Sequence, residues 1–189
     1  MNNEKYEYSL SKLLLHCCCA PCSVACVKSL RAQNISPSLY WYNPNIHPYT
    51  EFKSRTDCLK KFAGDEKLEL HLTEEYALRL FLKETFSELE TRCKKCYTIR
   101  LEKTASFAAS NGYSAFATSL LISPYQDHNA IKQAGESAAA KYGVYFYYKD
   151  FRPLFREGQA QARTHGMYMQ KYCGCVFSEE ERYSKGSVS

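Results

Sequence analysis

Short apolar runs alternate with segments of mixed polarity along most of this chain. Apolar runs of four to eight residues are typical of buried strands, and apolar positions three or four residues apart indicate helices. The strand candidates are residues 13–15, 38–42, 68–72, 115–122 and 144–148. Because each is followed by a helix or a crossing segment, the pattern predicts a three-layer α/β/α fold with a mostly parallel five-stranded sheet.

The segments between the strands carry helix signals. An apolar stripe at helical spacing runs through residues 78–89, and a second helical stripe ends at Asn111-Gly112. Asp127 can cap a helix that Gly143 closes. Residues 152–169 are compatible with either helix or loop.

Length, apolar content and net charge indicate the number of domains, the compartment and the possible partners of the protein. The 189 residues suit a single domain spanning 1–189, with 184–189 expected to be a disordered tail. Residues 1–9 lack the apolar core of a signal peptide, and no apolar run is long enough to cross a membrane. We therefore expect a cytoplasmic protein without a membrane partner. A net charge of +5 permits a nucleic-acid partner without requiring one.

The ten cysteines are clustered, which points to metal or redox chemistry under reducing conditions. Cys26 and Cys58 stand apart and are expected to act as small hydrophobic residues. The clustered thiols belong to Cys17, Cys18, Cys19, Cys22, Cys93, Cys96, Cys173 and Cys175.

The spacing within these clusters favours a shared site. Cys93 and Cys96 share one face at the start of a predicted helix, where thiolate is favoured. The glycine between Cys173 and Cys175 allows a tight turn. Adjacent residues such as Cys18 and its neighbour Cys19 point to opposite faces of a strand, but both can face a site where the strand ends.

The number of clustered thiols decides between metals. Six to eight exceed the four that one tetrahedral zinc needs, and they fit a four-cysteine iron–sulfur cluster plus a second metal or redox thiols. A structural zinc is the alternative on spacing alone.

Other polar residues gather after the predicted strands, where ligands bind in open α/β sheets. His16 could orient a thiolate or be a structural histidine, and the residues around Asn43 and Asn45 could be turn and cap residues instead of ligands. Neither GxGxxG nor GxxxxGK[ST] occurs, so no nucleotide cofactor is indicated. Cationic residues beside the central cysteine pair offer phosphate contacts: Arg92, Lys94, Lys95 and Arg100.

Five stretches together resemble the epoxyqueuosine reductase family QueH, from about residue 12 to residue 178. They are His16-x-Cys-Cys-Ala-Pro-Cys22, Tyr42-Asn-Pro-Asn-Ile-His-Pro48 with Glu51, Arg92-Cys-x-x-Cys-Tyr97 with Arg100 and Leu101, Ser123-Pro-Tyr-Gln-Asp-His128, and Tyr172-Cys-Gly-Cys175. One departure is Met169, where the family leads us to expect arginine after Tyr168.

The resemblance implies a Rossmann-like fold of the PP-loop and nucleotide-hydrolase group, and an iron–sulfur reductase. Such an enzyme converts epoxyqueuosine to queuosine in the anticodon loop of tRNA, the last step of queuosine biosynthesis, with electrons from an unidentified donor. It implies a [4Fe-4S] cluster with room for a second iron or other metal ion. The metal positions would be Cys18, Cys19, Cys22, Cys93, Cys96, Cys173 and Cys175, with Cys17 at a variable position.

The expected reaction also requires proton donors and residues that bind the RNA. Removal of an epoxide oxygen as water consumes two electrons and two protons, for which Asp127, His128 and Asp150 are candidate acids. The expected substrate or RNA contacts are Asn43, Asn45, Tyr97, Arg92, Arg100, Gln126 and Arg152. Two alternatives remain: a PP-loop-like tRNA sulfurtransferase, which would want a phosphate loop, and a zinc-stabilised RNA-binding protein.

Overall fold

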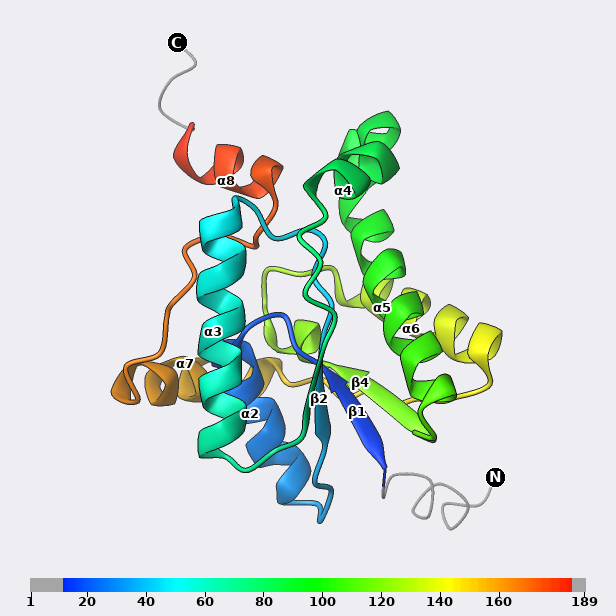
Figure 1. Ribbon diagram of the computed structural model, residues 1–189, viewed down its shortest axis with the longest axis vertical. Coiled ribbons are helices and arrows are strands. Elements are labelled where there is room, and N and C mark those ends of the chain that lie inside the picture. Colours follow the sequence, from blue (N-terminus) through cyan, green and yellow to red (C-terminus); the bar gives the residue numbers. More distant parts are fainter. Residues whose placement is uncertain (1–11, 185–189) are drawn as a thin grey trace.

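The computed structural model describes residues 12–184 and shows one parallel sheet between two layers of helices (Figure 1). The strands lie in the order β3-β2-β1-β4-β5, and every neighbouring pair is parallel. They are β1 (Leu13–His16), β2 (Ser38–Trp41), β3 (Leu70–Leu72), β4 (Ala115–Thr118) and β5 (Tyr145–Phe146). The predicted three-layer α/β/α class is confirmed.

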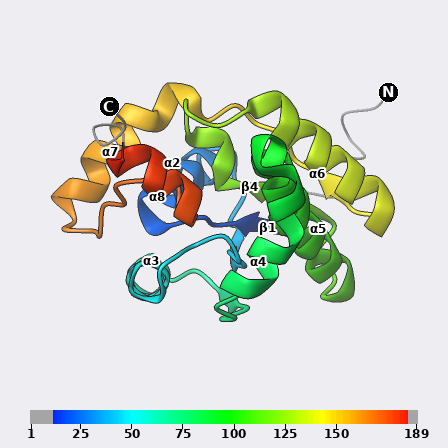
Figure 2. The ribbon, with the colours of Figure 1, turned by 90° about the horizontal axis from the view of Figure 1, so that it is seen from above.

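The strand order places the helices on two faces of the sheet. Right-handed crossovers from β1 through β3 put α2 (Ala20–Arg31) and α3 (Tyr49–Asp65) on one face. The chain then returns past β1, so α5 (Arg92–Ser110) and α6 (His128–Tyr142) cover the other face (Figure 2). The strand order therefore reverses between β1 and β4, where open α/β sheets form their binding crevice.

The C-terminal third completes the edge of this crevice. After the 3-10 turn η4 (Arg152–Leu154), α7 (Phe155–Thr164) packs on α2, and a Cβ added at Gly158 would lie 2.9 Å from that of Ala25. The short helices α4 (Leu78–Thr85) and α8 (Val176–Tyr183) stand on opposite sides above the carboxyl ends of the strands (Figure 1).

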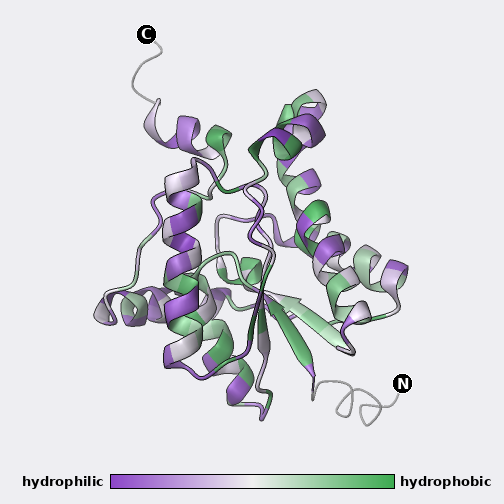
Figure 3. Cartoon of the chain, viewed as in Figure 1, coloured by the Kyte–Doolittle hydropathy of each residue, from purple (hydrophilic) through white to green (hydrophobic). Residues whose placement is uncertain are grey.

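The core follows the apolar runs seen in the sequence. Every residue of β1 and β4 is buried, and these two strands are mainly apolar, while the helices carry many polar residues (Figure 3). The ring of Tyr40 stacks on Phe107 at 4.5 Å, which joins β2 to α5. Gly135 on α6 leaves room for Phe146, whose ring carbon lies 2.4 Å from where a Cβ would stand.

Four predicted elements are shorter than the apolar pattern suggested. The prediction of a strand over 115–122 is wrong beyond Thr118, because the Thr118 hydroxyl accepts from the Leu120 amide at 3.2 Å and starts the 3-10 turn η3 (Ser119–Ile122). β5 covers two residues of the predicted 144–148, and β3 three of 68–72. The stripe at 78–89 is one helix only to Thr85, followed by the 3-10 segment η2 (Phe86–Thr91) with non-helical Glu88.

Two expectations about the chain ends lie mainly outside the described residues, namely those for 1–9 and for the tail beyond Ser184. Within residues 12–184, no helix is both long enough and apolar enough to cross a membrane.

Candidate active site

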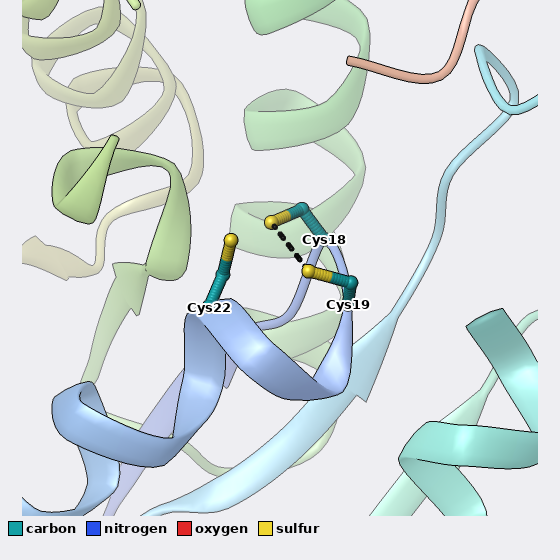
Figure 4. Close-up of side chains that lie close together, drawn as sticks. All are labelled: Cys18, Cys19 and Cys22. Carbon is teal, nitrogen blue, oxygen red and sulfur yellow. Dashed lines mark hydrogen bonds between the residues drawn. The ribbon is translucent and has the colours of Figure 1, made fainter. Parts of the chain in front are cut away.

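Three cysteine sulfurs face one another where β1 passes into α2 (Figure 4). The sulfurs of Cys18, Cys19 and Cys22 all lie within 4.8 Å of one another, and 3.8 Å separates Cys18 Sγ from Cys19 Sγ. β1 ends at His16, so the alternation of a strand no longer applies, and Cys19 is the extended residue that precedes α2. This is the convergence that the strand end predicted for Cys18 and Cys19.

The pKa values of these three thiols are shifted in different directions. Hydrogen bonds from Cys19 and Cys22, with help from Arg100, hold the pKa of the Cys18 thiol well below its usual range. Burial raises the pKa of Cys19, and the hydrogen bond to Cys18 raises that of Cys22. The Ser119 hydroxyl at the end of β4 also lies 3.4 Å from Cys18 Sγ. Cys18 is therefore the thiol of the set with the lowered pKa, and it lies at the crevice between β1 and β4.

A second thiol group lies across the crevice from the first. It consists of Cys93 and Cys96 at the start of α5 and of Cys173 and Cys175 in the turn before α8. Cys96 and Cys175 pack in one small buried cluster with Phe81. Burial raises the pKa of the Cys96 thiol to about 12, and the charges of Cys173 and Cys175 add to that rise. Of the described residues, only the first set has three metal-ligating atoms within 4.8 Å of one another, so the second group is more open.

A buried guanidinium lies between the two thiol groups. Arg100 is almost fully buried, 3.8 Å from Cys96 Sγ and 2.6 Å from Asn43 Oδ1. Burial lowers the pKa of Arg100, but its electrostatic interactions with the sulfurs of Cys96, Cys18 and Cys173 outweigh this and raise it overall. Asn43 Nδ2 in turn donates to the Cys17 carbonyl at 2.9 Å. Arg100 is thus a fixed positive charge that favours thiolate on both sides.

A second buried arginine fixes the C-terminal cysteines. Arg55 on α3 is 2% exposed and donates to the carbonyls of Tyr172 at 2.9 Å and Cys173 at 2.8 Å. Glu51 accepts from Arg55 at 2.6 Å and also from the Tyr168 hydroxyl. We call this set of contacts the Arg55 clamp. It holds the 168–174 segment on α3.

The turn between Cys173 and Cys175 depends on its glycine. Gly174 has φ of +140°, and a Cβ there would lie 3.1 Å from Ile46 and 3.3 Å from Arg55. The Gly174 carbonyl accepts from the His47 amide at 2.7 Å. The tight turn predicted from the glycine is present, and the loop after β2 anchors it.

The two thiol groups open on a cavity of about 680 Å³ at the carboxyl edge of the sheet. Cys18, Cys22 and Cys173 line it, together with aromatic and amide side chains. None of the described residues that line the cavity is Asp or Glu. Its cationic lining residues are Arg55, Arg100, Arg156, Arg163, Lys171 and Arg182. Such a cavity suits an anionic, partly aromatic ligand.

The remaining cysteines and His16 have structural surroundings. Cys17 is fully buried with a pKa raised to about 12 by burial, and its Sγ donates to the Leu15 carbonyl at 3.3 Å. Cys26 is buried and Cys58 is partly buried against the core. His16 contacts the Thr118 hydroxyl at 2.9 Å, and burial lowers its pKa to about 3. His16 is therefore a neutral histidine that joins β1 to β4.

None of the three candidate acids lines the cavity. Asp127 Oδ1 accepts from the Ala130 amide at 3.0 Å and so caps α6. His128 Nε2 contacts the Ser123 carbonyl at 3.3 Å, and its Nδ1 is buried without a partner among the described residues. Hydrogen bonds from Arg152 lower the pKa of Asp150 to about 2, so this carboxylate is ionised at neutral pH. Their catalytic role stays a prediction.

The other expected substrate contacts are divided between the cavity and structural roles. Gln126 lines the cavity, accepts from the Tyr97 hydroxyl at 2.7 Å and contacts Cys173 Sγ at 3.4 Å. Asn43 and Asn45 are buried and do not line the cavity. Arg92 pairs with Glu181 and Arg152 with Asp150, and neither lines the cavity.

Several residues of this site gave no signal in the sequence. Arg55, Ser119, Gln170 and the cationic residues of α7 look like ordinary helix, strand-end or surface positions when read alone. The Arg55 contacts join residues 117 and 118 positions apart, and Gln170 Nε2 lies 3.4 Å from Cys22 Sγ across 148 positions. Only the fold brings them together.

Comparison with known proteins identifies the family of this chain. A family model described as epoxyqueuosine reductase QueH matches residues 13–181. Proteins with that description from Dehalococcoides mccartyi and Thermotoga maritima are 39% and 34% identical, covering 92% and 93% of this chain and 96% and 94% of their own length. A crystal structure of a predicted tRNA methyltransferase subunit from Methanocaldococcus jannaschii shares the fold, with a TM-score of 0.51 and 14% identity, covering 84% of this chain and 89% of its own. With matches over nearly its whole length, this chain belongs to the epoxyqueuosine reductase QueH family.

Proposed function

We propose that this protein reduces the epoxide of epoxyqueuosine to the alkene of queuosine in the anticodon loop of tRNA, with an iron–sulfur cluster bound by its cysteines. The observation that carries the proposal is the cavity between the two thiol groups, lined by six cationic residues and by none of the described acidic ones. The family to which the chain belongs is described as an epoxyqueuosine reductase, which supports the reductase part of the proposal.

The donor set fits the implied cluster. Soft thiolates at the start of α2, at the start of α5 and in the turn before α8 are ligands that select iron–sulfur clusters over hard ions. Four of the thiols of Cys18, Cys19, Cys93, Cys96, Cys173 and Cys175 would hold the [4Fe-4S] cluster, and the remaining thiols, with that of Cys22, would be left for a second iron or another metal ion. When bound, such a centre supplies single electrons and a Lewis acid.

The chain supplies charge and exclusion of water around that centre. Arg100 and Arg55 keep thiolates stable in a buried site, because each guanidinium is desolvated and close to cysteine sulfur. An extruded base would enter the cavity from the edge of the sheet, since a base within a stacked loop cannot reach the thiols. Gln126 and Tyr172 offer an amide and an aromatic ring to hold it.

The overall reaction consumes two electrons and two protons. Both bonds to the epoxide oxygen break, a carbon–carbon double bond forms, and the oxygen leaves as water. Among the candidate acids, Asp127 is the one we assign, because it follows Gln126, whose amide contacts Cys173 Sγ. Catalytic contacts are often long in a ligand-free protein, so an indirect path through one water is compatible with its place.

Single-turnover assays test the proposal. Anaerobic protein with intact iron is reduced chemically, mixed with tRNA bearing epoxyqueuosine, and the nucleosides are read by mass spectrometry. Conversion to queuosine is expected, and its absence with intact iron would refute the reductase assignment. The need for a separate electron donor and the cytoplasmic location both stay predictions.

Colour tests the cofactor separately. Iron–sulfur protein should be brown with broad visible absorption. Colourless protein that contains zinc and binds RNA would favour the zinc-stabilised alternative.

A further inference from the structure

The cavity-facing side of α7 is cationic. Arg156, Gln159 and Arg163 are spaced by three and four residues, so they share one face of the helix, and all three line the cavity. The neighbouring face, with buried Gly158 and Ala162, packs on α2. The packing of α7 therefore fixes which side chains it presents to the cavity.

The cationic residues at the mouth have no counter-charge. We call Arg156, Arg163, Lys171 and Arg182 the cationic rim; all four are exposed and line the cavity. Within residues 12–184, none of their side chains makes an ion pair or hydrogen bond, whereas the nearby Lys28 pairs with Glu157 at 2.6 Å. Four like charges around one opening repel each other unless a polyanion binds there.

Two further observations at the same opening point to a ligand. Tyr125 is 85% exposed, lines the cavity and contacts Phe155 edge-on at 6.0 Å between ring centroids. At the cavity wall, the buried Nε of Arg100 and Oε1 of Gln170 have no partner among the described residues. An exposed aromatic ring beside unpaired cations is the combination that binds single-stranded nucleic acid.

We propose that the RNA strand next to the target nucleotide docks along α7 and the 170–182 segment, with its phosphates on the cationic rim and a flanking base stacked on Tyr125. The inference rests on the proposed function, because it takes the RNA as substrate. It also moves the phosphate contacts away from those expected on sequence. Arg92 pairs with Glu181, Lys95 lies 3.7 Å from Glu84, and Arg100 is buried, which leaves only Lys94 unpaired.

The first test is RNA affinity as a function of salt. A labelled anticodon stem–loop without the modification is titrated with iron-loaded protein, and binding is read by fluorescence anisotropy. The double variant Arg156→Ala/Arg163→Ala should bind at least about tenfold more weakly. Its log–log salt slope should become shallower by about 1.4, because each single-strand phosphate contact contributes about 0.7.

A matched double variant removes the same charge at the opposite edge. This control is Lys12→Ala/Lys67→Ala. Lys12 precedes β1 and Lys67 precedes β3, so both residues lie at the amino ends of the strands. It should keep wild-type affinity and slope. Equal losses in both double variants, or a full loss of slope in Lys94→Ala/Lys95→Ala instead, would overturn the assignment of the cationic rim. If the α7 variant loses its iron or its helicity, Lys171→Ala/Arg182→Ala takes its place.

The second test separates stacking from charge. Tyr125→Ala should weaken binding about tenfold without a change in salt slope, and Tyr125→Phe should keep the affinity because the ring remains. Equal behaviour of the two variants would remove Tyr125 from the docking surface.

Failure of this inference is distinguishable from failure of the proposed function. Wild-type turnover together with unchanged binding by the α7 and Tyr125 variants would refute the docking surface and leave the reductase standing. Loss of RNA binding in those variants, with no turnover by the wild type, would do the reverse.

Discussion

Cys18 and Cys19 show how two adjacent residues come to serve one site. In a strand they would diverge, but β1 ends at His16 and Cys19 adopts the extended geometry (φ −173°) that leads into α2. Pro21 in the first turn of α2 costs no hydrogen bond there, and Cys22 then returns its sulfur to the pair. The strand end in the sequence allowed Cys18 and Cys19 to face one site, whereas Cys22 was included only through the family resemblance.

The two thiol groups give a prediction for iron content. Cys93→Ser or Cys96→Ser should abolish stable iron binding, because both thiols lie near Cys173 and Cys175 in the second group. Cys26→Ser or Cys58→Ser should leave iron near the wild-type level. Iron and sulfide assays on anaerobically purified protein measure both. A similar loss in all four variants would contradict this division of the cysteines.

Asp127 gives a prediction about proton transfer. Asp127→Asn should keep the cluster and RNA binding but slow conversion of epoxyqueuosine by roughly a hundredfold, the low end for loss of one general acid. Asparagine still accepts from the Ala130 amide, so the cap of α6 and the folded state are preserved. The measurement is single-turnover conversion with chemically reduced enzyme. Near-normal turnover would leave Asp127 with the capping role alone.

At the scale of elements, the sequence predicts type and order better than length. Apolar runs and cap residues indicate all five strands and most helices, because those signals are local. β4 stops early because Thr118 turns its hydroxyl toward the next amides, and β5 is short because it is an edge strand with one neighbour. The sequence did not show whether residues 152–169 form a helix or a loop. The reason is that α7 is stabilised by packing on α2, which is far away in sequence.

The Arg55 clamp gives a prediction at this scale. Arg55→Lys should weaken metal binding about tenfold, as loss of a group that orients ligands does, because one ammonium cannot replace the fork to Tyr172, Cys173 and Glu51. Metal affinity is measured by competition with a chelator. Lys53→Ala, an exposed position on the same helix, is the control and should bind metal normally. Equal affinities in the two variants would show that α3 does not fix these ligands.

For the whole molecule, the site joins segments that the sequence keeps far apart. The loop after β1, the start of α5 and the turn before α8 bring their cysteines to one edge of the sheet. The sequence predicts that edge from the rule for parallel strands. It does not predict the side of the opening that carries the unpaired cations, because that depends on which arginines find carboxylates in the folded state. Arg92 finds Glu181, while Arg156 and Arg163 find none among the described residues.

Metal removal should therefore affect the whole molecule. A metal centre bound by the clustered cysteines would tie the 173–175 turn to α2 and α5, and a ligand present at about a thousand times its dissociation constant stabilises the folded state by about 4 kcal/mol. For a chain of this size, that corresponds to a fall in Tm on the order of 10 °C after chelation. Differential scanning fluorimetry under anaerobic conditions measures it. Limited proteolysis should then cut first between residues 165 and 184, because only a few contacts would remain there, chiefly the Arg55 clamp, the hydrogen bond from the His47 amide to the Gly174 carbonyl, and the Arg92–Glu181 ion pair. Cys26→Ser protein serves as the control and should show the same fall. An unchanged Tm in metal-free protein, with the same cleavage pattern, would mean that the cysteine site contributes nothing to the folded state and serves chemistry only.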